Sequence, residues 1–229
     1  MNAASAPATA EPRLSGMSLR AVSAVVMAIP VLSAVYFGSP WFTALVLVAG
    51  VAMGWEWARM CKGDPKWLMA GALYICIPSG ILIWLRADMT AGMITIFWLL
   101  AVVWSADIAA YIFGRAIGGP KLAPRISPKK TWAGFIGGVS TATVVAGVFA
   151  FFWDETPLWL GLWGAVVAIA SQAGDLLESA IKRHFDVKDS SSLIPGHGGV
   201  LDRVDALVAG AMAIAVLKYT LGRSVMPWL

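Results

Sequence analysis

The feature that most constrains the fold of this chain is the length of its uncharged apolar runs. Residues 21–55 contain no charged side chain, and only the Gly38-Ser39-Pro40 segment interrupts them. A helix needs about 20 apolar residues to cross the roughly 30 Å of hydrocarbon in a bilayer, so this run alone supplies two membrane spans. The same reasoning along the whole chain predicts seven transmembrane helices, at residues 19–37, 41–59, 67–85, 89–106, 131–153, 156–174 and 204–221.

Composition supports the same fold class. Hydrophobic residues make up 59% of the 229 residues and charged residues only 13%, whereas a soluble domain carries about 25% charged residues. Such a chain cannot cover a soluble globule with polar side chains, which excludes a soluble enzyme, a nucleic-acid-binding domain and a disordered chain. The apolar runs are continuous and do not alternate, so sheet is not expected in them. We therefore predict an all-α, polytopic integral membrane helical bundle of about seven helices.

The basic residues predict how this bundle is oriented and divided. A cytoplasmic N-terminus puts fourteen of the seventeen Lys and Arg residues on the cytoplasmic side, as the positive-inside rule requires. The predicted location is the cytoplasmic (inner) membrane, and two polar loops, 114–130 and 182–203, would share its cytoplasmic face. The predicted parts are a disordered cytoplasmic tail over 1–18, N-terminal transmembrane helices over 19–104, and a catalytic transmembrane region over 105–229 that carries both loops.

Ionisable side chains in or beside the predicted spans are candidates for function, because each costs about 2.5–3.5 kcal/mol at the centre of a membrane helix. They form three sites: Asp107 near the end of the fourth span; Asp175, Glu178, Ser179 and Lys182 after the sixth; and Asp202, Arg203 and Asp205 at the start of the seventh. Positions three and four apart share a helix face, so the second group must face the bundle interior or a wet cavity. The alternative is an i,i+4 salt-bridge ladder at the membrane edge, which accounts for Glu178 with Lys182 but not for Asp107 or Asp175.

Two glycine-rich loops flank these sites. In residues 188–205, the turn around His197 lets the backbone approach a ligand closely, and a helix start that favours anions follows it. Taken alone, a loop histidine is more often a turn residue than a catalyst. The loop 114–130 combines glycines with five basic residues and with Ser127 before a helix. For any single lysine there, a solvated positive-inside position is the simpler explanation.

Together these residues predict a class of chemistry. Carboxylates without a His/Cys cluster suit a hard, oxygen-liganded cation such as Mg²⁺. Nearby lysines and arginines suit phosphates, and no Ser-His-Asp order or Cys-His pair indicates a covalent acyl intermediate. We therefore predict phosphoryl or nucleotidyl transfer at the cytoplasmic membrane surface, with a lipid as one substrate and no nucleic-acid partner.

The stretch SAIKRHFDVKDSSSLIPGHGGVLDRVD, residues 179–205, resembles the signature of the phosphatidate cytidylyltransferases, or CDP-diacylglycerol synthases. Three further stretches support the resemblance: SADIAAYIFGR at 105–115, ISPKKTW at 126–132 and GDLLES at 174–179. One position departs from the family, since Ala133 stands where members usually have Glu after Lys-Thr-Trp.

The resemblance implies a Mg²⁺-dependent enzyme of phospholipid biosynthesis that converts CTP and phosphatidate into CDP-diacylglycerol and pyrophosphate, and it suggests a homodimer. The expected metal ligands are Asp175, Asp202 and Asp107. The expected catalytic residues are Asp175, Asp202, Lys182, Lys188, Asp189 and His197. The expected substrate-binding residues are Ser127, Lys129, Lys130, Ser179, Arg183, Gly198, Gly199 and Arg203.

Other classes remain as alternatives. A different lipid-phosphate enzyme, such as a polyprenol kinase or a glycosyl-phosphate transferase, would share the membrane, the metal and the phosphates but would not require this signature. A transporter for an anionic solute would line a path through the bilayer with charges, often with inverted repeats, whereas here the charges gather toward one side. A structural scaffold gives no reason for three acidic sites beside glycine-rich loops.

Overall fold

The computed structural model describes residues 16–152, 156–194 and 198–221, so most of the predicted tail lies outside the described residues. Within these ranges the chain is mostly helical, which confirms the predicted helical bundle. The helices are α1 (Gly16–Phe37), α2 (Trp41–Met60), α3 (Pro65–Ala87), α4 (Gly92–Ala116), α5 (Trp132–Val148), the short 3₁₀-helix η1 (Phe149–Phe152), α6 (Pro157–His184) and α7 (Leu201–Leu221).

Five helices in the described part of the chain are long and apolar enough to cross a membrane: α2, α3, α4, α5 continued by η1, and α6. The described apolar part of α1 is shorter. α7 is not in this group, and it carries Asp202, Arg203 and Asp205 at its start and Lys218 near its end. The polytopic membrane character is therefore confirmed, with five helices rather than the expected seven meeting these criteria.

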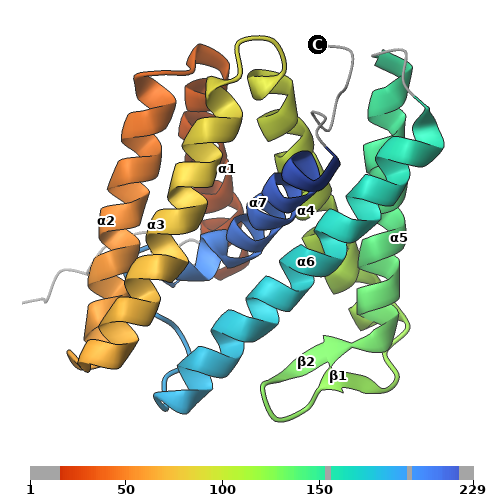
Figure 1. The fold of residues 1–229 in the computed structure, drawn as a ribbon. Coiled ribbons are helices and arrows are strands. Elements are labelled where there is room, and N and C mark those ends of the chain that lie inside the picture. The colour runs from red at the N-terminus through yellow and green to blue at the C-terminus, as the bar shows by residue number, and fades with distance from the viewer. Residues whose placement is uncertain (1–15, 153–155, 195–197, 222–229) are drawn as a thin grey trace, which may run out of the picture.

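The polar loops gather at one end of the bundle. Successive helices run up and down, and the end of α2, the connection from α4 to α5 and the end of α6 all lie at the lower end of Figure 1. The two polar loops therefore share one end, as the basic residues predicted. Both α4 and α6 continue past their predicted spans, to Ala116 and His184, so that Asp107 and residues 175–182 lie within continuous helices.

A β-hairpin stands where the sequence predicted only a polar loop between α4 and α5. Its antiparallel strands are β1 (Lys121–Ala123) and β2 (Ser127–Thr131), with Lys121 opposite Thr131 and Ala123 opposite Ser127. The strands lie between the apolar runs, so they do not conflict with the argument against sheet inside those runs. The Arg183 side chain of α6 donates to the carbonyl oxygen of Ile126 at 3.4 Å, which holds the hairpin against the end of α6.

Glycines let the helices that carry the polar residues approach closely. A Cβ added at Gly134 of α5 would lie only 2.6 Å from the carbonyl oxygen of Ala110 in α4. A Cβ at Gly174 of α6 would lie 2.9 Å from the carbonyl oxygen of Asp205 in α7. The second approach brings Asp175, the next residue of α6, beside the first turns of α7.

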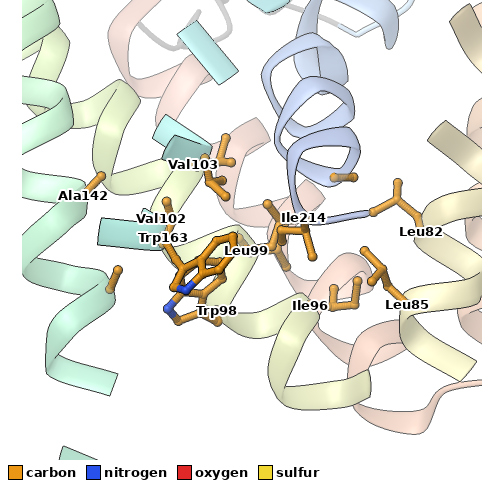
Figure 2. Packing of buried hydrophobic residues seen from close by; sticks show 14 of the residues in the cluster. Leu82, Leu85, Ile96, Trp98, Leu99, Val102, Val103, Ala142, Trp163 and Ile214 are labelled. Atoms are coloured by element: carbon orange, nitrogen blue, oxygen red, sulfur yellow. The ribbon is translucent and has the colours of Figure 1, made fainter. Parts of the chain in front are cut away.

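The main apolar core lies around the first half of α4, away from the hairpin. Trp98, Leu99 and Val102 of α4 are completely buried. Figure 2 shows them among side chains of the neighbouring helices, including Trp163 of α6 and Ile214 of α7. This packing holds α4, α6 and α7 together on the apolar side of the charged residues.

At the end opposite the hairpin, Asp88 stabilises the start of α4. Its carboxylate accepts hydrogen bonds from Lys218 Nζ at 2.9 Å and from the backbone N–H groups of Thr90 and Ala91, each at 3.2 Å. The hydrogen bond from Lys218 holds the pKa of Asp88 well below its usual value.

We expect Asp88→Ala to lower the free energy of unfolding by about 1 kcal/mol, because it removes a partly exposed salt bridge and a helix-start acceptor. Since the folded pKa lies below the unfolded value of about 3.9, the charge contribution is present above about pH 4 and is lost as the pH falls further. Thermal unfolding of the purified protein, its Asp88→Ala variant and Asp88→Asn, which keeps one capping oxygen, checks this at pH 7 and at pH 3. A difference that stays the same at both pH values would contradict the charge contribution.

Candidate functional site

The predicted polar face of α6 turns toward the bundle interior. Glu178 and Lys182 are buried, and Asp175 and Ser179 are half-buried. Lys182 Nζ lies 2.8 Å from Glu178 Oε2, and Ser179 Oγ donates to Asp175 Oδ1 at 3.4 Å. The i,i+4 salt bridge of the alternative interpretation is therefore present, but it is buried and belongs to a larger network.

Lys182 also joins α6 to α7. Its ammonium group lies 2.6 Å from Asp202 Oδ1, as well as 2.8 Å from Glu178 Oε2. The Lys182 side chain is 11% exposed and the Asp202 side chain 4% exposed, so water screens this contact little. Two predicted catalytic residues are thus in direct contact, although they lie 20 residues apart in the sequence.

Asp202 organises the loop that leads into α7. Its Oδ2 accepts hydrogen bonds from the Ser190 N–H at 3.0 Å, the Ser190 hydroxyl at 2.9 Å and the Gly199 N–H at 2.8 Å. Burial by itself raises the pKa of Asp202, but the hydrogen bonds from Lys182, Gly199 and Ser190 outweigh burial and hold the pKa below its usual value. Asp202, which lies outside the five candidate spans, is therefore ionised at neutral pH.

Glu56 of α2 also binds the loop that leads into α7, and it was not among the predicted site residues. Its side chain is fully buried, and it accepts hydrogen bonds from the N–H groups of Val200 and Leu201 at 2.9 and 2.8 Å. The hydroxyls of Ser190 and Ser191 also donate to it, at 3.2 and 2.6 Å. A signal existed, because Glu56 is a carboxylate inside the predicted second span, where a charge is as costly as that of Asp107 near the end of the fourth.

The hairpin supplies a second, more open ion pair. Lys130 Nζ of β2 lies 2.6 Å from Asp175 Oδ2, and the two side chains are 23% and 33% exposed. Asp107 of α4 is close enough to interact electrostatically with Asp175, Lys130 and Arg203. Residues from α4, the hairpin, α6 and α7 therefore meet around Asp175.

Asp205 adds a further carboxylate inside the bundle. It is buried one turn after Asp202 and interacts electrostatically with Asp175, Glu178 and Lys182. Lys182 is thus surrounded by acidic groups from both α6 and α7, which neutralise its charge within the protein.

The other predicted site residues lie toward the surface at the same end of the bundle. Exposed residues are Lys129, Arg183, Lys188, Asp189 and Arg203, and Ser127 is half-buried. His197 lies outside the described residues. Ala133 is the second residue of α5 and is half-buried, so this position brings no charge to the hairpin end.

The glycine-rich turn before α7 is closely packed. Gly198 has φ +84°, a conformation that side chains with a Cβ rarely adopt. A Cβ added at Gly199 would collide with Ser190 Oγ and Glu56 Oε1. Both positions therefore require glycine for the fold of the loop, whatever else they do.

The backbone N–H groups at the start of α7 already serve carboxylates of the protein. Gly199 N–H donates to Asp202, whereas Val200 and Leu201 donate to Glu56. The sequence predicted this helix start as a site for an anion. In the structure, the anions that occupy these donors are the two side chains.

The described residues contain no cluster of three or more His, Cys, Asp or Glu side chains arranged to hold a metal ion. The predicted metal ligands differ in solvent exposure and in how many hydrogen bonds they already accept. Asp175 keeps a one-third exposed side chain and Asp107 is exposed, whereas Asp202 is buried and accepts hydrogen bonds at both oxygens. The Asp107 and Asp175 pair is the more accessible donor set.

Comparison with known proteins agrees with these motifs. Residues 64–221 match the cytidylyltransferase family. A phosphatidate cytidylyltransferase from Brucella suis is 51% identical over 172 residues, which is 72% of this chain and 61% of that protein. Phosphatidate cytidylyltransferases from Rickettsia bellii and Rickettsia conorii are 36% and 34% identical over 205 and 212 residues, covering 86% and 89% of this chain and 88% and 92% of theirs.

The Brucella match covers only part of that relative. The chain spans about three fifths of the length of the Brucella relatives that it matches. The contacts between Lys130, Asp175, Lys182 and Asp202 lie inside the matched residues 64–221, whereas Glu56 precedes them.

Proposed function

The chain belongs to the cytidylyltransferase family, and from this premise we propose that it transfers the cytidylyl group of CTP to phosphatidate, with CDP-diacylglycerol and pyrophosphate as products. The relatives from Brucella suis and Rickettsia bellii are named for this activity. The observation that carries the proposal is the buried contact of Lys182 with Glu178 and Asp202, beside the open Lys130–Asp175 pair, at one end of an apolar helical bundle. A lipid phosphate held at a membrane surface would meet charged groups at such an end.

In this reaction a phosphate oxygen of phosphatidate attacks the α-phosphorus of CTP. The new P–O bond forms as the bond from the α-phosphorus to the oxygen bridging the α- and β-phosphorus breaks, and pyrophosphate leaves with that bridging oxygen. Such transfer depends mainly on positioning and on neutralising charge, so no protein nucleophile is required. This agrees with a site built from Lys, Arg, Asp and Glu side chains.

The exposed cations are the side chains best able to contact phosphates. Lys129, Arg183, Lys188 and Arg203 are exposed at the end of the bundle that carries the site. Lys130 and Lys182, in contrast, are each neutralised by carboxylates. We assign the first group to the triphosphate and the lipid phosphate, and the second to the shape of the site. Ser127, Ser179, Gly198 and Gly199 would line the phosphate site, and Asp189 and His197 would shape the nucleotide loop or assist proton transfer.

The donor set around Asp175 fits Mg²⁺. Mg²⁺ is usually bound through one or two carboxylates together with substrate phosphates and waters, and Asp175 and Asp107 offer two accessible carboxylates near each other. When bound, the ion would supply positive charge that stabilises the phosphates of CTP. Asp202 is a predicted third ligand that would have to exchange some of its present hydrogen bonds for the metal.

The location of the reaction is part of the same proposal. We place the site on the cytoplasmic face of the inner membrane, because the basic residues concentrate in the loops at the end of the bundle that carries the site. A homodimer is a further prediction, which chemical cross-linking of the purified protein would test.

We expect the purified protein in detergent to incorporate radiolabelled CTP into a lipid product when phosphatidate and Mg²⁺ are present. ATP and UDP-sugars, tested in place of CTP, should give no labelled lipid, which separates this activity from a lipid kinase or a sugar-phosphate transferase. Removing Mg²⁺ with EDTA should abolish labelling, and adding Mg²⁺ in excess should restore it. Labelling from ATP but not from CTP would overturn the proposed function, and full activity in EDTA would overturn the metal assignment alone.

A further inference from the structure

Glu56 is a buried charged residue that the proposed function does not use. It lies in the apolar helix α2, yet within the described ranges its hydrogen-bond donors come from the loop before α7 and the start of α7: Ser190, Ser191, Val200 and Leu201. None of the salt bridges in the described part of the chain includes Glu56. A buried carboxylate is costly without partners, so these hydrogen bonds are what makes it tolerable there.

Ser190 connects Glu56 with Asp202. Its Oγ lies 3.2 Å from Glu56 Oε2 and 2.9 Å from Asp202 Oδ2, and its N–H donates to Asp202 as well. A hydroxyl has one proton, so the two carboxylates compete for the donor of Ser190. The state of Glu56 therefore affects how Asp202 is held.

Glu56 also holds the backbone just before Asp202. The N–H groups of Val200 and Leu201 donate to its two oxygens, at 2.9 and 2.8 Å. A negative charge near a helix N-terminus is favourable, because the free N–H groups there carry partial positive charge. This contact ties the start of α7 to α2.

We infer that Glu56 is a positioning residue: it fixes the start of α7 and, through Ser190, the orientation of Asp202 and of the Lys182 ammonium bound to it. The inference rests on the proposed function, since it takes Asp202 to act in cytidylyl transfer and Lys182 to shape the site. It makes α2 part of the working site, although Glu56 precedes the residues that match the family.

The first test is Glu56→Gln in the full chain, assayed with CTP and phosphatidate. Glutamine keeps the size of the side chain but has only one oxygen. Its NH₂ group would face the N–H and O–H donors that one Glu56 oxygen now accepts from. We expect kcat to fall about 10- to 100-fold, as for other residues that position a ligand-binding group without touching the ligand. KM for CTP should stay within about twofold of wild type. Thermal unfolding of the same preparation shows whether the variant is folded.

A matched serine pair separates positioning from simple anchoring. The hydroxyls of Ser190 and Ser191 both lie within hydrogen-bond distance of Glu56, but of these two described serines only Ser190 also has its hydroxyl within reach of Asp202. We expect Ser190→Ala to lower kcat about tenfold and Ser191→Ala to leave it within about twofold of wild type. The double variant Glu56→Gln/Ser190→Ala should lose less than the product of the two single losses, because both act on Asp202.

Equal loss of kcat in the two serine variants would overturn the inference and leave Glu56 as an anchor of the fold. Wild-type kcat in folded Glu56→Gln protein would overturn it as well. If Glu56→Gln does not fold, the serine pair decides alone. An absence of CTP incorporation by the wild-type protein would instead overturn the proposed function, so the two failures are distinguishable.

Discussion

Asp202→Asn should lower kcat/KM for CTP-dependent formation of the lipid product by about a hundredfold or more while leaving membrane insertion intact. One oxygen of Asp202 accepts a hydrogen bond from Lys182 at 2.6 Å, and the other accepts from the N–H groups of Ser190 and Gly199. Asparagine has only one oxygen, so its NH₂ group must face donors on one side or the other. The measurement is turnover of radiolabelled CTP by purified protein, with membrane fractionation to check insertion.

Asp186→Asn is a suitable control for this change. Asp186 lies exposed in the turn just after α6 and has φ +55°, a conformation that asparagine also adopts readily. The control removes the same charge from the same end of the bundle, outside the network, and should keep wild-type turnover. Near-normal turnover in correctly inserted Asp202→Asn protein would contradict the role of Asp202 in the site.

Lys182→Met should destabilise the fold by about 3–5 kcal/mol, because removing one partner of a buried ion pair leaves uncompensated charge behind. The Lys182 ammonium lies between Glu178 and Asp202, and all three side chains are almost entirely buried. Without it, two carboxylates would face each other in the interior. Thermal unfolding in detergent, followed by intrinsic tryptophan fluorescence, measures the loss.

The double variant Lys182→Met/Glu178→Gln tests whether charge is the cause. It removes one of the two carboxylates left without a cationic partner, so it should recover part of the lost stability without recovering turnover. Equal unfolding temperatures for the single and double variants would show that lost packing, rather than uncompensated charge, accounts for the destabilisation.

The sequence predicted the residues of the α6 face correctly because helical spacing is a local property. Asp175, Glu178, Ser179 and Lys182 follow one another at three and four positions, and the structure turns this face inward. The ends of helices were predicted less well. Loss of apolar character marks where a helix leaves the hydrocarbon, not where its hydrogen bonding stops, and α4 continues nine residues past Asp107 to Ala116.

The uncharged run ends at Trp55, so a selection of spans by uncharged runs leaves out Glu56, the next residue. Its partners lie more than 130 residues away in the sequence, and no spacing rule connects residues so far apart. The hairpin was also missed, since it is a short element in a basic loop. Its position depends on contacts with α6, among them the Lys130–Asp175 ion pair.

The sequence by itself determined that this chain is an apolar helical bundle with its polar loops at one end, because uncharged run length and basic-residue distribution follow directly from solvation. Its motifs also indicated the family to which the chain belongs. Only the tertiary structure decided the contacts between elements: Lys182 with Asp202, Lys130 with Asp175, and Glu56 with the backbone N–H groups at the start of α7. The physical reason is that most of these contacts cross between helices, where close packing at residues such as Gly174 brings them together.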